Sequence, residues 1–438
     1  MKEKKLFAGI VEMDITPPIG YWMGGYAART EPSKMVHDSL ILKILSLFDG
    51  RKRVIIVCAD LVSFSNKFCS RVKETIKKEC GFSKSDVFLF VSHTHTGPLI
   101  NENASYLPNK KYFSEEYRIL LIQKICGGIK EAQLREEEVI VSYGEGEAAI
   151  GINRRKKTDK GMEMKPNPEG PVDNIVQVVK FQKMNGQMLA VLFKACCHPT
   201  TLGANYEISA DYPGVARCEI EKIYPGVSAM FINGCCGDVR PAMTDGDKFK
   251  AGHFSDVESL GRILAGETVK CIEKAKPLKN MTLESRIVKH QFDYEKTLIP
   301  GNLKQLEALK KKYMKREAEF HGYIEKWAEK MAEKIRNDEK LPKNTAADFM
   351  ILKIGDLSLL ALSGEVMVEY GLKIRQKAKT KVIVAAYANE DIDYVPTAQA
   401  IKDGGYEASS FIFEEEPAPY SLDIERKLIE KVLTVINN

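Results

Sequence analysis

Side chains that can bind a metal follow three apolar segments that are predicted to be β-strands. They are His93 and His95 after 87–92, His198 after 189–197, and Glu365 after 357–362. The ends of strands converge on a common edge in α/β folds, and ligands bind at that edge. Imidazole nitrogens and carboxylate oxygens are donors that catalytic zinc sites use, with one position left open for water. The sequence therefore predicts a divalent-metal site and favours a metal-dependent hydrolase.

One residue separates His93 from His95, and the chain holds only seven histidines. Side chains two positions apart point the same way on an extended strand end. Both imidazoles are therefore expected to face one site while Thr94 faces the core. Two surface histidines in a loop are the alternative, and neither His198 nor Glu365 would indicate a site alone. Because three of the seven histidines follow strand ends, the joint pattern is the stronger interpretation.

The composition is that of a soluble globular protein, with 44% hydrophobic and 29% charged residues. The net charge of +5 is small beside 65 basic and 60 acidic residues, and this argues against nucleic acid as a partner. No segment approaches the roughly eighteen apolar residues of a membrane helix, so stable membrane insertion is not expected. The start of the chain lacks the pattern of a signal peptide. Ten cysteines without a Cys-x-x-Cys pair indicate buried thiols, and a cytoplasmic location is expected.

Apolar segments of strand length alternate with amphipathic helical patterns along the chain. The expected strands are 53–58, 87–92, 175–181, 189–197, 228–232, 349–354, 357–362 and 382–386. The expected helices are 66–80, 117–131, 213–223, 255–274 and 421–436. This alternation predicts an α/β fold with a mixed β-sheet core flanked by helices, in a single domain spanning 1–438.

Residues 302–338 differ from the rest of the chain. They are rich in Lys, Glu and Arg, and Gly322 is their one glycine. The pattern predicts one long or two joined charged helices inserted in the domain. The simpler interpretation is that these helices extend from the core of the domain into solvent. A dimerisation arm that would make a homo-oligomer, or a lid over the site, is the alternative.

The run HTHTGP at 93–98 resembles the HTHSGP signature of the neutral/alkaline (non-lysosomal) ceramidase family. Further segments resemble elements of that family in the same order: DITP (14–17), INR (152–154), CHPT (197–200), SADYPG (209–214), NGCCGDV (233–239), GE (364–365), YVPT (394–397) and YEASS (406–410). The resemblance covers nearly the whole chain except the charged helices. It implies the fold of the ceramidase catalytic domain. A homologue with the catalytic domain only is expected, because the chain ends at Asn438 without the immunoglobulin-like domain of ceramidases.

The resemblance also implies one zinc ion per chain. Its ligands would be His93, His198, Glu365 and Tyr394. His95 would then lie beside the activated water and the substrate as a proton carrier or hydrogen-bond donor, a task that suits a group with a pKa near neutrality. Arg154 and Tyr406 would contact the substrate and the developing oxyanion. For Tyr394, a structural core tyrosine is the alternative.

Arg240 departs from the family pattern. The family element GDVSPN carries a serine assigned to amide turnover, and here residues 237–242 read GDVRPA. A guanidinium in a pocket pairs with carboxylate or phosphate, which favours a strongly polar or anionic substrate. The alternatives are a solvent-facing salt bridge, or a structural pairing with Asp211 or Asp238.

These observations predict a zinc-dependent amidohydrolase that cleaves a C–N bond in a small polar molecule by metal-activated water. Arg240 is counted with His95, Tyr406 and Arg154 among the catalytic residues. An anionic substrate is expected if no protein carboxylate pairs with Arg240. The alternatives are a metalloesterase or lactonase on the same scaffold, a true ceramidase, and a non-catalytic ligand-binding homologue.

Overall fold

The larger of two main β-sheets forms the centre of the computed structural model, which describes residues 5–101, 113–317 and 320–437. Its nine strands run in the order β12-β10-β9-β6-β1-β3-β4-β5, with β16 paired to β6. They are β1 (Leu6–Asp14), β3 (Ile41–Phe48), β4 (Arg53–Ala59), β5 (Val87–Val91), β6 (Glu137–Glu147), β9 (Ile175–Lys183), β10 (Met188–Ala195), β12 (Ser228–Asn233) and β16 (Lys276–Pro277). The sheet is mixed, because β4–β5 and β10–β12 are parallel and its other pairs are antiparallel.

A smaller sheet packs face to face against the larger one. It has the order β17-β20-β21-β23. Its strands are β17 (Leu283–Val288), β20 (Phe349–Ile354), β21 (Leu357–Ala361) and β23 (Lys381–Ala385). Alternate side chains of both sheets fill the space between them, including Leu45, Ile56, Phe88, Leu352, Leu359 and Ile383. Strands covered on both faces read as continuous apolar runs, as β4 and β5 do.

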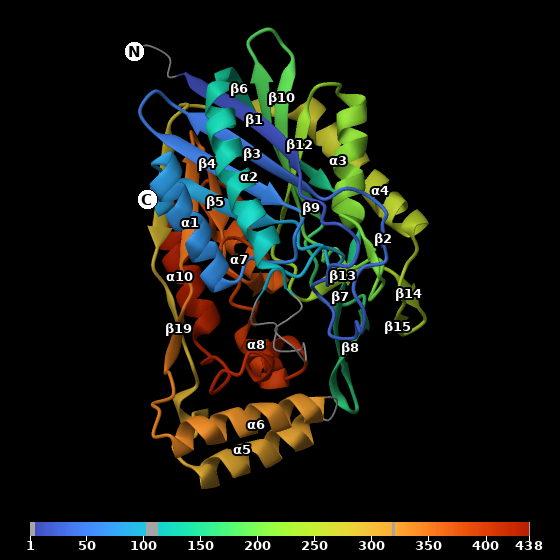
Figure 1. Ribbon diagram of the computed structural model, residues 1–438, viewed down its shortest axis with the longest axis vertical. Helices are drawn as coiled ribbons and strands as arrows, with labels where there is room; N and C mark the ends of the chain where they lie inside the picture. Colours follow the sequence, from blue (N-terminus) through green and yellow to red (C-terminus); the bar gives the residue numbers. More distant parts are fainter. Residues whose placement is uncertain (1–4, 102–112, 318–319, 438) are drawn as a thin grey trace.

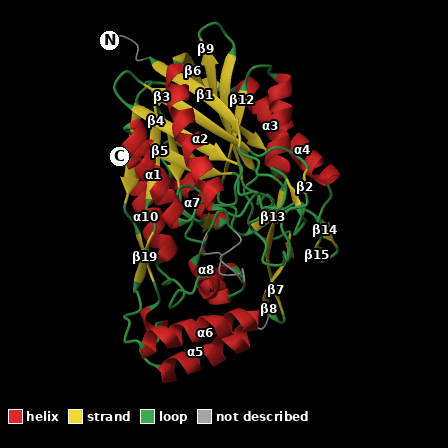
Figure 2. Cartoon of the chain, viewed as in Figure 1, coloured by secondary structure: helices red, strands yellow, loops and turns green. Residues whose placement is uncertain are grey.

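Helices cover the outer faces of both sheets (Figure 1). On the larger sheet they are α1 (Asn66–Cys80), α2 (Glu115–Leu134), α3 (Asp211–Ile223) and α4 (Phe254–Lys274). On the smaller sheet they are α7 (Val368–Lys377) and α10 (Ile424–Ile436). The layers therefore run helix, sheet, sheet, helix, which is the expected mixed α/β fold (Figure 2). None of the helices in the described ranges has the length and apolar content needed to cross a bilayer.

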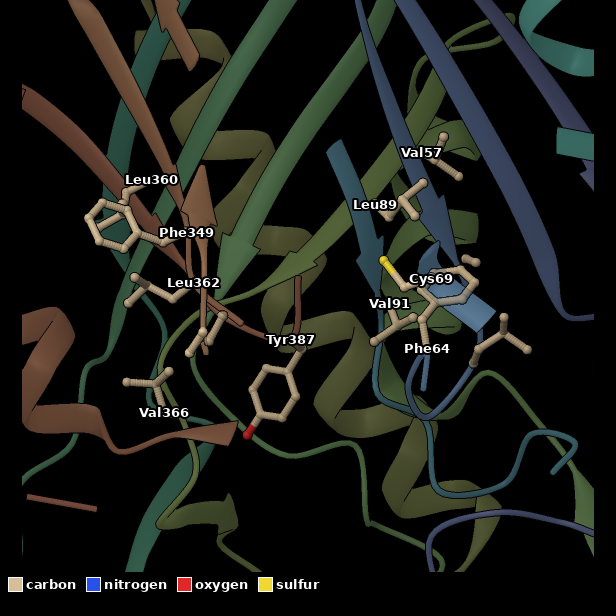
Figure 3. Packing of buried hydrophobic residues seen from close by; sticks show 14 of the residues in the cluster. Val57, Phe64, Cys69, Leu89, Val91, Phe349, Leu360, Leu362, Val366 and Tyr387 are labelled. Atoms are coloured by element: carbon tan, nitrogen blue, oxygen red, sulfur yellow. The ribbon is translucent and has the colours of Figure 1, made fainter. Parts of the chain in front are cut away.

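The segment 385–389, which follows β23, joins the two sheets. The N–H of Ala386 donates to the carbonyl of Asn233 at the end of β12 (3.0 Å), and the N–H of Asn389 donates to a carbonyl of β5 (2.7 Å). Tyr387 and Asn389 have left-handed φ values of 54° and 59°. The side chain of Tyr387 lies between apolar side chains of the two sheets (Figure 3). The ends of β5, β12 and β23 are thereby held at one place.

A three-stranded sheet in the order β13-β7-β8 stands beside this point. Its strands are β7 (Gly151–Thr158), β8 (Gly161–Asn167) and β13 (Val239–Pro241). β13 pairs antiparallel with β7, so that Arg240 lies opposite Ile152. Arg154 is two residues from Ile152, and its N–H donates to the carbonyl of Asp238, two residues before Arg240 (2.9 Å). A bulge between Asn153 and Arg155 interrupts the strand alternation there.

The charged segment 302–338 contains two helices, α5 (Leu303–Arg316) and α6 (His321–Arg336), at one end of the molecule (Figure 1). Their apolar side packs on Phe411 and Ile412 of the same chain. The hairpin thus braces the C-terminal segment that carries Tyr406. Homo-oligomerisation through the hairpin stays a prediction.

Candidate metal centre

Donor atoms from the three strand ends meet at one point. Nε2 of His198 lies 2.9 Å from Oε2 of Glu365, and Nε2 of His93 lies 3.5 Å from the same oxygen. Nε2 of His95 lies 3.0 Å from Nε2 of His93. Tetrahedral zinc, with bonds of about 2.0–2.1 Å, holds its ligand atoms about 3.3 Å apart. These separations therefore suit one divalent ion.

The second ring nitrogen distinguishes the three histidines. Nδ1 of His93 donates to the carbonyl of Val62 (2.6 Å), and Nδ1 of His198 donates to the carbonyl of Cys236 (2.6 Å). Metal-binding histidines nearly always use their other nitrogen in this way, which fixes the tautomer and turns the free lone pair toward the metal. Nδ1 of His95 is buried and has no hydrogen-bond partner among the described residues. His93 and His198 thus have the second hydrogen bond that is typical of metal ligands and His95 lacks it, although ring nitrogens of all three histidines lie within 4.8 Å of one another.

The backbone at His93 differs from the expectation of an extended strand end. β5 ends at Val91, and His93 has a left-handed φ of 64°. Its N–H donates to the carbonyl of Leu61 (3.0 Å), which helps to hold this turn. The two imidazoles nevertheless come together, with ring centroids 4.7 Å apart, and Thr94 is buried as expected. The prediction of a common face was right, but its strand-based reason was wrong.

Glu365 and Tyr394 lie side by side in a short parallel pair of strands, β22 (Glu365–Val366) and β24 (Tyr394–Val395). Gly364 precedes them with a φ of 80°, and a Cβ there would come within 2.5 Å of the carbonyl of Asp393. Glycine is therefore required at this turn. The hydroxyl of Tyr394 is buried and accepts a hydrogen bond from Nη2 of Arg154 (3.0 Å). Burial raises the pKa of Tyr394, and the Arg154 charge opposes that rise.

Arg154 and Arg155 share one buried carboxylate. Nε of Arg154 donates to one oxygen of Glu407 (2.7 Å), and Nη1 of Arg155 donates to the other (2.5 Å). Burial alone would raise the pKa of Glu407, but the two guanidinium groups lower it below its ordinary value. The guanidinium of Arg154 lies 5.4 Å from the ring centroid of Tyr394 and 5.6 Å from that of Tyr406. Glu407 thus fixes a positive charge beside both tyrosines.

Arg240 has no ion-pair partner among the described residues, and its buried Nε has no hydrogen-bond partner there. Its guanidinium lies 4.4 Å from the ring centroid of Phe249. The two carboxylates considered from the sequence are used elsewhere. That of Asp211 accepts from the hydroxyl and N–H of Thr201, and that of Asp238 accepts from Asn153 and from the first N–H of α7. A structural pairing of Arg240 with either aspartate is therefore wrong.

Several residues around the histidines were missed by the sequence analysis. The ring of Tyr26 contacts that of His95 (5.0 Å between centroids), and the ring of Tyr387 contacts that of His93 (4.3 Å). A Cβ on Gly25 would come within 2.6 Å of the His95 ring. The adjacent glycines Gly24 and Gly25 could have indicated that another residue packs closely against the backbone there. Tyr387 carries no comparable mark in the sequence, whereas Glu407 lies in the YEASS element (406–410) but was given no role.

Comparisons with known proteins identify a family and a fold. Residues 7–325 match the family model described as neutral/alkaline non-lysosomal ceramidase, N-terminal. A crystal structure of neutral ceramidase from Pseudomonas aeruginosa is similar, with a TM-score of 0.73 and 19% identity over 99% of this chain and 75% of that chain. A structure of ceramidase complexed with C2 gives a TM-score of 0.75 and 18% identity with the same coverage. At these identities the two structures establish a shared fold.

The first prediction separates metal ligands from their neighbours. His198→Ala should lose most of its zinc after gel filtration, because a catalytic site has few protein ligands to spare. His95→Ala should keep about one zinc per chain, and so should the exposed control His321→Ala. Elemental analysis measures all three. Full zinc in His198→Ala, or loss of zinc in His95→Ala, would contradict this ligand assignment.

A second prediction concerns Glu407. Glu407→Gln should lower the free energy of unfolding by about 3–5 kcal/mol, because it leaves two buried guanidinium groups without their anion. The folded state lowers the pKa of Glu407 below its ordinary value of about 4.5. The stabilisation is therefore fully present at a pH above about 4.5, and it is lost as the pH falls through the lowered pKa of the folded state. Urea denaturation at neutral and acidic pH measures both effects. The exposed Glu430→Gln should cost at most about 1 kcal/mol, and equal losses in the two variants would refute the role of Glu407.

Proposed function

The chain belongs to the neutral/alkaline non-lysosomal ceramidase family, and from this premise we propose that it is a zinc-dependent hydrolase of the amide bond in a small N-acyl compound. The family supports an amide-bond hydrolase. The observation that supports zinc dependence is that the imidazoles of His93 and His198 lie against the carboxylate of Glu365. Each imidazole is held in place by a hydrogen bond from its Nδ1. Two histidines and a glutamate are also the ligands of known catalytic zinc sites.

The protonation states of these groups fit a divalent cation. Burial lowers the pKa of His198 to about 4, so that its imidazole is neutral near pH 7 and can donate its lone pair. Burial alone would raise the pKa of Glu365, but His93 and His198 outweigh this effect and hold the pKa well below its ordinary value. The carboxylate therefore stays ionised. We propose Tyr394 as the fourth donor. A bound zinc ion would supply Lewis-acid polarisation of the carbonyl and would make a water molecule more acidic.

His95 is proposed to move the proton. Burial lowers the pKa of His95 well below its ordinary value, and the neighbouring imidazoles of His93 and His198 act in the same direction. The imidazole is therefore neutral near pH 7 and can accept a proton from the attacking water and pass it to the leaving nitrogen, although the lowered pKa makes it a weaker base than the near-neutral group expected from the sequence. The contact with Tyr26 and the close approach of Gly25 restrict the position of the ring.

Arg154 and Tyr406 are proposed to stabilise the negative charge that develops on the carbonyl oxygen. Glu407 holds the guanidinium of Arg154 in place before substrate binds, and such preorganised donors act without reorganisation during the reaction. Burial raises the pKa of Tyr406 above its ordinary value, which keeps the hydroxyl protonated and able to donate.

Ceramide hydrolysis is the second candidate, and the family match over residues 7–325 favours it. The arginine at 240 argues for a more polar substrate. A metalloesterase or lactonase would use the same groups, but an ester needs less protonation of its leaving group. The ten free cysteines fit the proposed cytoplasmic location.

The third prediction tests the function. Chelation should abolish hydrolysis of N-acyl compounds, and one equivalent of zinc should restore it. The panel contains ceramide, simple fatty amides, acidic amides and the matched esters, assayed with wild type and His95→Ala. In an amidase, His95→Ala should lower amide turnover by roughly 100- to 10,000-fold and ester turnover much less. Full activity of the metal-free protein, or no turnover of any N-acyl compound, would refute the proposal.

A further inference from the structure

Arg240 differs from the other arginines near the metal centre in having no acceptor among the described residues. Arg154 and Arg155 share the carboxylate of Glu407. Arg29 donates to the backbone carbonyls of three residues, among them His95. In the part of the chain that the structure describes, no carboxylate pairs with Arg240 and no acceptor reaches its buried Nε. Arg240 is half-buried, and leaving its buried Nε without an acceptor is unfavourable, so this position suits a ligand that supplies one.

The position of Arg240 relates it to the metal centre. The pairing of β13 with β7 places Arg240 opposite Ile152, two residues from Arg154, which donates to the hydroxyl of Tyr394. The ring of Phe249 lies 4.4 Å from the guanidinium and restrains its plane. Burial raises the pKa of Tyr26, and the charge of Arg240 lowers it, which indicates that these two side chains are close. The charge of Arg240 acts on Tyr26, Arg154 and Tyr394.

Tyr26 also links Arg240 to the proposed proton carrier, because its ring contacts the ring of His95. Under the proposed function, His95 gives its proton to the nitrogen that leaves. Arg154 and Tyr406 act at the carbonyl oxygen instead. A substrate group that passes Tyr26 and reaches Arg240 is therefore attached to the leaving nitrogen of the substrate and not to its acyl carbon.

We infer that Arg240 and Phe249 form an anion subsite for the amine half of the substrate, which makes the substrate class an N-acylated amino acid or amino phosphate. This inference rests on the proposed function. Hydrolysis would consume water and release a carboxylic acid and an amine that still carries its anion. A carboxylate two bonds from the nitrogen matches the planar fork of arginine, which binds carboxylates through two parallel hydrogen bonds. The serine of the family pattern at this position carries no charge and suits a neutral amide.

The fourth prediction uses matched substrates. All four compounds share one scissile amide. The first carries a carboxylate on the amine half, the second a phosphate there, and the third a neutral carboxamide there. The fourth carries its carboxylate on the acyl half. Arg240→Gln should raise KM for the first compound by roughly 10- to 100-fold, the usual worth of a hydrogen bond to a charged group, and change it little for the neutral one. Arg240→Lys should fall between, and the exposed control Arg262→Gln should match wild type.

The outcomes separate the two proposals. A preference of the wild type for phosphate over carboxylate supports the subsite and identifies phosphate as the anion. Equal effects of Arg240→Gln on charged and neutral compounds, or a preference for the acyl-half carboxylate, would overturn the subsite while leaving amide hydrolysis intact. Failure of every N-acyl compound to react would instead refute the proposed function.

A binding measurement keeps the test independent of turnover and of the folding of the variant. By calorimetry, the wild-type protein should bind the N-acyl amino acid roughly 10- to 100-fold more tightly than its carboxamide. The free amino acid product should likewise inhibit more strongly than the amino amide. Equal affinities for the acid and the carboxamide would overturn the subsite even if Arg240→Gln could not be purified.

Discussion

The metal centre depends on the hydrogen bonds that hold the segment 385–389 between β5 and β12. These strands are the two ends of the larger sheet, and isolated bridges from Ala385 to Gly234 and from Ala388 to Phe90 connect both of them to the end of the smaller sheet. The left-handed conformations in this segment are costly and persist only where surrounding bonds determine them. Because the strand ends are fixed there, His93, His198 and Glu365 come from three separate strands to one point.

Compensation of buried charge governs the chemistry of the site. Glu365 lies against two imidazoles, and Glu407 lies against two guanidinium groups, so these ionised groups have partners without bulk water. A site arranged in this way is preorganised, because its donors need not be reoriented during the reaction. Arg240 has no carboxylate partner in the ranges that the structure describes, and this is the reason to look to the substrate for the anion.

Much of the architecture could be predicted from the sequence. The helix predicted at 66–80 is α1, the segment 302–338 forms two helices, and the three apolar segments end beside one another. The division into two packed sheets could not be predicted, because a strand covered on both faces shows no alternation that reveals its partner. The left-handed turn at His93 and the shared use of Glu407 depend on contacts distant in sequence. Tyr394 was found only through the resemblance to the ceramidase family.

The central claim is that Glu365, and not His95, completes the metal site with His93 and His198. An anomalous-difference map at the zinc absorption edge, from crystals of the zinc-loaded protein, tests it most directly. The account predicts one peak at about 2.0–2.3 Å from both Nε2 atoms, the Glu365 carboxylate and the Tyr394 oxygen, with His95 beyond bonding distance. A peak bonded to all three histidines with Glu365 outside bonding distance would contradict it.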